Sequence, residues 1–77
     1  MDKYTAMNEQ QLHFTVFCIE ALADDIGTTG DKTYLMLSEQ SDILDNYIVR
    51  CYDALHTQGR DYIVEDLKEL LRDRGLL

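Results

Sequence analysis

The side chains best suited to chemistry lie around one histidine in the last third of the chain. His56 follows Asp53 by three residues and is succeeded by Thr57, Gln58 and Asp61. A histidine–carboxylate pair can act as a general base, but catalysis also requires a nucleophile or substrate held beside it, and local spacing places no serine or reactive thiol there. A histidine near a helix C-terminus can equally cap a carbonyl and stabilise the helix dipole. We therefore expect no catalytic residue here and a structural or partner-binding role for His56, with a small enzyme using His56 and Asp53 as an alternative.

Two cysteines and two histidines could in principle form a zinc site. His13 and Cys18 lie five residues apart, as do Cys51 and His56. That spacing separates each pair by about 140° on a helix, whereas ligands that share a helical face are three or four residues apart. We therefore expect no metal site and interpret both thiols as reduced, buried side chains, as in the cytosol. No phosphate loop or dinucleotide fingerprint is present, so no cofactor is expected either.

The charge of the chain limits its partners. It has 77 residues, with 15 acidic side chains against 7 Lys and Arg and a formal net charge of -8. A negative surface repels phosphate, which disfavours nucleic acid and favours a basic protein partner, although the same charge can serve solubility alone. No stretch approaches the roughly 18 apolar residues of a membrane span, and the first residues do not resemble a secretory signal. We expect a cytoplasmic protein without a membrane partner.

Capping residues predict the first two helices. Asn8 opens a capping-box pattern, and the long helix behind it is expected to run to about Asp25, before Gly27. Thr29 is expected to cap a short helix over residues 30–39.

The second half of the chain predicts two more helices. Ser41 is expected to cap a helix that ends near Thr57, and Asp61 to cap a last helix that Gly75 closes. The turn between them contains Gly59 and has the outline of a helix-turn-helix. We therefore expect an all-α fold: a compact bundle of four short helices, with one long N-terminal helix, a short second helix and a helix-turn-helix-like pair. The chain is expected to form one domain over 1–77, with 1–7 as a flexible arm.

The long N-terminal helix has two apolar seams. One seam comprises Phe14, Phe17, Cys18, Ala21 and Leu22, and the other comprises Leu12, Val16, Ile19, Ala23 and Ile26. A surface helix needs a single apolar stripe a little over about 100° wide, so we expect this helix to be contacted from two sides. The second side is covered either by the other helices or by another molecule, a partner protein or a second copy in a homodimer. The candidate partner-binding residues are Leu12, Val16, Ile19, His56, Thr57, Gln58 and Asp61.

The helix-turn-helix outline leaves a dimeric DNA-binding regulator as another alternative. The reading helix would present Tyr62, Ile63, Glu65 and Asp66 near its start. Glu65 and Asp66 are acidic and would repel the phosphates of DNA. This alternative therefore requires a basic face, which the sequence does not show.

The chain resembles a small bacterial family known as domain of unknown function 3791. The similarity lies in residues 17–23, 52–59 and 61–66, with Leu55-His56-Thr57-Gln58-Gly59 as its most recognisable part, and it extends over residues 8–75. Members of the family are often encoded beside other small genes, including proteins that resemble ADP-ribosyltransferase toxins. The resemblance therefore implies a protein that binds an operon neighbour, in an antitoxin-like role, and it supplies no catalytic residues.

Overall fold

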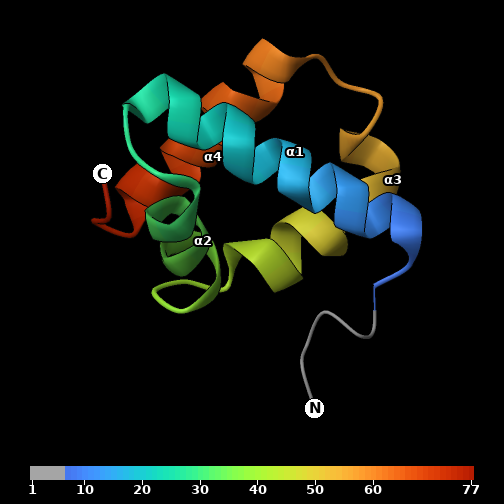
Figure 1. Ribbon diagram of the computed structural model, residues 1–77, viewed down its shortest axis with the longest axis horizontal. Helices are drawn as coiled ribbons and strands as arrows, with labels where there is room; N and C mark the ends of the chain where they lie inside the picture. The colour runs from blue at the N-terminus through green and yellow to red at the C-terminus, as the bar shows by residue number, and fades with distance from the viewer. Residues whose placement is uncertain (1–6) are drawn as a thin grey trace.

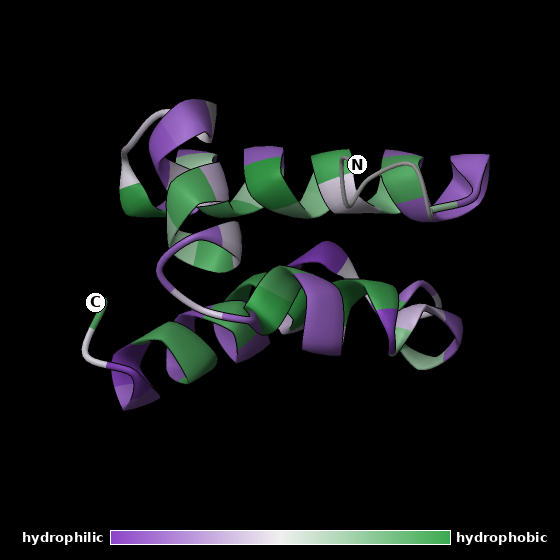
Figure 2. Ribbon diagram, turned by 90° about the horizontal axis from the view of Figure 1, so that it is seen from below, coloured by the Kyte–Doolittle hydropathy of each residue, from purple (hydrophilic) through white to green (hydrophobic). Residues whose placement is uncertain are grey.

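The computed structural model describes residues 7–77, which form helices and no strand. The helices are α1 (Glu9–Ile26), α2 (Gly30–Ser38), the π-helix η2 (Leu44–Val49), α3 (Tyr52–Leu55) and α4 (Arg60–Asp73). Figures 1 and 2 show α1 as one layer, η2, α3 and α4 as the opposite layer, and α2 joining the two at one end. The expected all-α bundle is confirmed. The expected flexible arm lies outside the described residues except for Met7, which is half-buried against the core.

The capping box of α1 forms as predicted. The Asn8 side chain accepts a hydrogen bond from the Gln11 backbone N–H at 2.7 Å, and the Gln11 side chain accepts one from the Asn8 N–H at 3.1 Å. At the other end, Gly27 has a φ of 74° and ends the helix in the left-handed conformation that glycine adopts without a Cβ clash. Thr29 caps α2 as predicted, because its hydroxyl accepts a hydrogen bond from the Lys32 N–H at 3.2 Å.

The prediction of a single helix between Ser41 and Thr57 is wrong, because the structure divides this segment into η2 and α3. In a π-helix the hydrogen bonds join residues five apart, and the wider turn brings such residues onto one side. Ile43 and Ile48 are five apart and both fully buried, so the widened turn serves the core. Ser41 contacts the end of α2 by donating to the Met36 carbonyl at 2.7 Å, and its hydroxyl accepts only a 3.3 Å hydrogen bond from Ile43.

The prediction that Asp61 caps α4 is also wrong. The residue with the extended backbone of an N-cap is Gly59, with φ -73° and ψ 162°, and no side chain caps this end of α4. Asp61 lies in the first turn, where its carboxylate still interacts favourably with the helix dipole. The C-terminal prediction is confirmed, since Gly75 has a φ of 73° and the Leu76 N–H returns to the Leu71 carbonyl at 2.9 Å.

The core lies between the two layers. It includes the fully buried leucine and isoleucine side chains of α1, α2, η2 and α4 together with the residue before η2: Leu22, Leu37, Ile43, Leu44, Ile48, Ile63, Leu67 and Leu71. Two threonines are buried among them, and each satisfies its hydroxyl within its own helix. Thr15 donates to the Gln11 carbonyl at 2.8 Å and Thr33 to the Thr29 carbonyl at 2.9 Å. The hydroxyl donors of these two buried threonines are therefore both satisfied.

Candidate functional site

Four rings form a continuous aromatic row that joins α1 to α3. Phe17 stacks on Phe14 with ring centroids 6.2 Å apart, and Phe14 meets the Tyr52 ring edge-on at 5.5 Å. Tyr52 in turn stacks on the His56 imidazole at 4.5 Å, with an angle of 13° between the two planes. Figure 1 shows α3 beside the N-terminal half of α1, which is where this row lies. Such ring pairs stabilise an arrangement beyond the area that they bury.

Three large apolar side chains of α1 are open to solvent. Leu12 is 41% exposed, Val16 43% and Phe17 39%, and all three lie within six residues of one helix. We call them the outer face of α1. Single exposed hydrophobic residues are ordinary on a protein surface, whereas a contiguous group of them is typical of an interaction site. Leu12 and Val16 lie one turn apart, and the exposed polar residues Glu9, His13 and Glu20 lie between them and Phe17 around the helix. The structure therefore covers α1 on one side and leaves the other side open along its first half.

The structure does not bury either of the two predicted apolar seams of α1 as a unit, because each seam contains both buried and exposed residues. In the first seam, Cys18 and Leu22 are fully buried but Phe17 is exposed. In the second, Ala23 is buried, while Ile19 is half-buried and lies against the start of α2, with its Cγ2 atom 3.8 Å from the position that a Cβ at Gly30 would occupy. Ile19 is thus separated from the exposed positions with which it was predicted.

The residues predicted in the turn after α3 are all exposed. His56, Thr57, Gln58 and Asp61 lie at the surface, and the Thr57 hydroxyl donates to the Ala54 carbonyl at 3.0 Å. Only His56 belongs to the aromatic row, so it is the one member of this group that connects to α1 through ring contacts.

The structure does not assemble the histidine–carboxylate pair that the enzyme alternative requires. Within residues 7–77 the His56 ring contacts Tyr52 and forms no ion pair or hydrogen bond with Asp53. His56 therefore lies at the surface, with its ring stacked on Tyr52.

Arg60 fixes the start of α4 against α1. Its guanidinium donates to the Ala21 carbonyl and to the Asp24 carboxylate, both at 3.3 Å. This contact holds the turn beside the second half of α1, while the Asp61 side chain is fully exposed. The sequence analysis missed Arg60, because its partners lie 36 and 39 residues earlier in the chain.

Other cations are also engaged by the chain's own carboxylates. The Lys68 ammonium lies 2.8 Å from Asp25, and the hydrogen bonds that it donates to this carboxylate and to Glu65 raise the pKa of Lys68. Arg74 contacts Asp42 at 3.0 Å, and hydrogen bonds from Asn46 and Arg74 lower the pKa of the Asp42 carboxyl. Within residues 7–77, Arg60, Lys68 and Arg74 are thus paired with carboxylates, so these three cations do not provide the basic face that the DNA-binding alternative requires.

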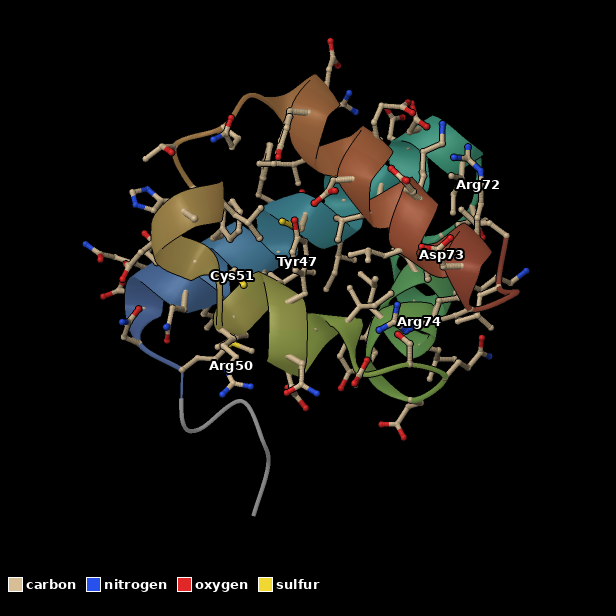
Figure 3. The ribbon with its side chains drawn as sticks, turned by 180° about the vertical axis from the view of Figure 1, so that it is seen from behind. Tyr47, Arg50, Cys51, Arg72, Asp73 and Arg74 are labelled. Atoms are coloured by element: carbon tan, nitrogen blue, oxygen red, sulfur yellow. The ribbon has the colours of Figure 1, made fainter. Side chains whose placement is uncertain are left out.

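The sequence analysis also missed a polar contact between η2 and α4. Tyr47 points from η2 toward α4 and its hydroxyl donates to the Asp66 carboxylate (Figure 3). Burial raises the pKa of the Asp66 carboxyl, because the charged form is partly removed from water. The one sequence signal was that Asp66 adjoins Leu67 on the apolar side of α4.

This contact predicts a different pH dependence for two asparagine variants. A raised pKa means that the folded state holds its proton more tightly, so the contribution of Asp66 to stability falls as pH rises from its ordinary value, about 3.9, through the folded pKa. Urea unfolding should therefore show Asp66→Asn gaining stability relative to wild type between pH 4 and pH 7. Asp42→Asn is the matched control: because the Asp42 pKa is lowered, its loss of stability relative to wild type should develop as pH rises toward about 4 and should stay nearly constant between pH 4 and pH 7. Parallel pH profiles for both variants would contradict this assignment.

The two thiols differ in burial. Cys18 is fully buried, and burial raises its pKa to about 12, so it packs as a neutral hydrophobic side chain as predicted. Cys51 is only half-buried, so its predicted burial is wrong; it lies at the junction of η2 and α3 (Figure 3). Both thiols are free, and residues 7–77 bring together no cluster of three potential metal ligands. In the same part of the chain, no helix is long and apolar enough to cross a membrane.

The comparison with protein families agrees with the resemblance in the sequence. The model of a family described as protein of unknown function, DUF3791, matches residues 13–74. The chain belongs to the DUF3791 family. No curated protein and no solved structure matches it. The DUF3791 region includes the aromatic row, two of the three residues of the outer face, and the turn at His56.

Proposed function

We propose that this DUF3791 chain is a protein-interaction module that binds a basic protein. The binding surface is the outer face of α1 together with the exposed end of the aromatic row at His56. The observation that supports it is the exposure of Leu12, Val16 and Phe17, each by about two-fifths, on one half of one helix. Protein interfaces have an apolar and aromatic centre surrounded by polar groups, and burial of this centre supplies much of the binding free energy.

The charge of the chain supports a basic partner over a second copy. The net charge is -8, and Glu9, Glu20 and Asp24 are exposed on α1 around the outer face. Two identical surfaces of this charge repel each other, whereas a positive partner gains from complementary potentials and faster association.

The mechanism that fits such a surface is steric occlusion or assembly of a complex. An antitoxin-like role, in which the module covers the functional surface of a toxic partner encoded beside it, is the specific form that the family resemblance implies. It requires a stable interface and no catalytic group on this chain. We propose that this binding takes place in the cytoplasm, where thiols are kept reduced.

Co-purification from the native genomic context tests the proposal. We expect the tagged chain to retain one stoichiometric basic protein at low salt. Raising the salt from 0.1 M to 1 M should weaken the complex, because the Debye length falls from about 10 Å to about 3 Å. Mass spectrometry identifies the retained chain, and light scattering measures the mass of the complex.

Two outcomes would contradict the proposal. A bait that retains no stoichiometric chain would leave the outer face without a partner protein. A dimer of the bait itself that Val16→Asp converts to a monomer would assign the outer face to self-association.

A further inference from the structure

A run of consecutive exposed residues joins α3 to α4. It extends from His56 to Tyr62, between the buried residues Leu55 and Ile63, and we call it the α3–α4 stretch. Figure 1 shows it in orange, leading from α3 beside the N-terminal half of α1 to the start of α4. Because each of its residues is exposed, contacts at the surface decide where this stretch lies on the molecule.

Two contacts attach this part of the chain to α1. Just before the stretch, the Tyr52 ring meets the Phe14 ring edge-on at 5.5 Å. Near its far end, the Arg60 guanidinium donates to the Ala21 carbonyl and to the Asp24 carboxylate, both at 3.3 Å. The α3–α4 stretch is therefore held against α1 by an aromatic contact on one side and by an arginine on the other.

The remaining polar contacts of the stretch are local. The Thr57 hydroxyl and the Gln58 N–H both donate to carbonyls of α3, at 3.0 Å and 2.9 Å, and the Arg60 guanidinium also lies 3.9 Å from Asp61. Within residues 7–77, only the hydrogen bonds and the ion pair of Arg60 join the stretch to α1. Arg60 is thus the residue that ties this exposed part of the chain to the helix that carries the outer face.

The attachment points on α1 lie on either side of Phe17. Successive members of the row are three, four and three residues apart, so they follow one side of the helix: Phe14, Phe17, Ala21 and Asp24. Phe14 and Ala21 are two turns apart, about 10 Å along the axis. Phe17, which is 39% exposed, therefore lies between the aromatic contact and the Arg60 contact, on the side of α1 that the stretch follows.

We propose that Arg60 is a positioning residue of the binding surface, which holds the α3–α4 stretch on α1 so that His56 and Phe17 contact one partner together. This inference rests on the proposed function, because it assigns a role within the same interface. A surface that is already ordered binds more tightly, since the free energy of ordering it is not lost on binding. The side chains of Arg60 and Asp24 are 44% and 84% exposed, and such exposed ion pairs contribute little to stability.

Replacing Arg60 by glutamine should mobilise the stretch while the protein stays folded. Glutamine is shorter and uncharged, so it loses the ion pair with Asp24 and the reach to the Ala21 carbonyl. ¹⁵N relaxation of the labelled full chain, without any partner, measures the effect. We expect backbone order parameters at Thr57 and Gly59 to fall from about 0.85, typical of rigid backbone, to below about 0.6.

Arg74→Gln is the matched control. It removes the same charge and breaks the ion pair between Arg74 and Asp42, whose side chains are 39% and 58% exposed, but it does not touch the stretch. Order parameters at Thr57 should therefore stay at the wild-type value. Arg60→Lys retains a cation and should give values between those of wild type and Arg60→Gln. Similar urea midpoints for the two glutamine variants would show that they differ in position and not in stability.

Isothermal titration against the co-purified partner measures the effect on binding. Arg60→Gln should weaken binding about three- to tenfold, as expected when a few groups must be ordered on association, and Arg74→Gln less than about twofold. Both variants lose one positive charge, so a general effect of net charge on a basic partner would appear in both.

The possible failures are distinct. A wild-type chain that binds no stoichiometric partner would contradict the proposed function and with it this role of Arg60. A wild-type chain that binds its partner, together with unchanged order parameters in Arg60→Gln or equal binding by the two glutamine variants, would overturn the role of Arg60 alone.

Discussion

Replacing Leu22 by alanine is expected to leave much of the protein unfolded at room temperature, while the same replacement at Leu12 leaves it folded. Leu22 is fully buried in the core between the two layers, whereas Leu12 is 41% exposed on the outer face. A buried leucine-to-alanine change costs about 2–5 kcal/mol, and a core in a domain of this size supplies about 3–5 kcal/mol in total. The exposed change removes few packing contacts and should cost about 0.5 kcal/mol or less.

Urea unfolding followed by circular dichroism measures both variants under one set of conditions. The comparison isolates burial, because the chemical change is the same and both residues lie on α1. Equal losses of unfolding free energy would contradict the division of α1 into a buried side and an outer face.

Replacing Phe17 by aspartate is expected to weaken partner binding by about 30- to 1,000-fold while the chain stays folded. Phe17 is 39% exposed and contacts Phe14 at one end of the aromatic row. Aromatic residues at the centre of an interface contribute about 2–4 kcal/mol on truncation. A new carboxylate also adds the cost of removing a charge from water at the interface.

Tyr62→Asp is the matched control for this variant. Tyr62 is also an exposed aromatic residue, 56% exposed, but it lies on α4 outside the outer face and the aromatic row. It acquires the same negative charge, so a general effect of net charge would appear in both variants. Isothermal titration against the co-purified partner should show the large loss for Phe17→Asp alone, and similar losses for both would remove the outer face from the interface.

The features that sequence analysis predicted correctly depend on local hydrogen bonds. The capping box at Asn8, the Thr29 cap and the glycine turns at Gly27 and Gly75 each involve residues within a few positions of one another. Local spacing is visible in the sequence, so the starts and ends of α1 and α2 could be predicted almost to the residue.

The features that sequence analysis missed depend on contacts between distant segments. The division of the third helix follows from placing Ile43 and Ile48 together in the core, which overrides a continuous α-helical period. The Tyr47–Asp66 contact joins residues 19 apart, and the aromatic row joins α1 to α3. Neither follows from the spacing within a single helix.

The candidate site could be predicted only in part for the same reason. A helical wheel showed that α1 has more apolar surface than one neighbour needs, but it could not show which seam the other helices cover. The start of α2 packs against α1 at Ile19, which is half-buried, whereas Leu12 and Val16 remain exposed. Phe17 was assigned to the opposite seam, although the structure places it on the open side of α1.

Chemical-shift mapping of the labelled chain, with and without its co-purified partner, most directly tests the outer face of α1 as the binding surface. The proposed interface predicts that the largest shifts lie at Leu12, Val16 and Phe17, with further shifts at Tyr52 and His56. Amides along α4 and at Lys32 on α2 should remain nearly unchanged. Shifts concentrated on α4 or α2, with the outer face unaffected, would contradict the proposed interface.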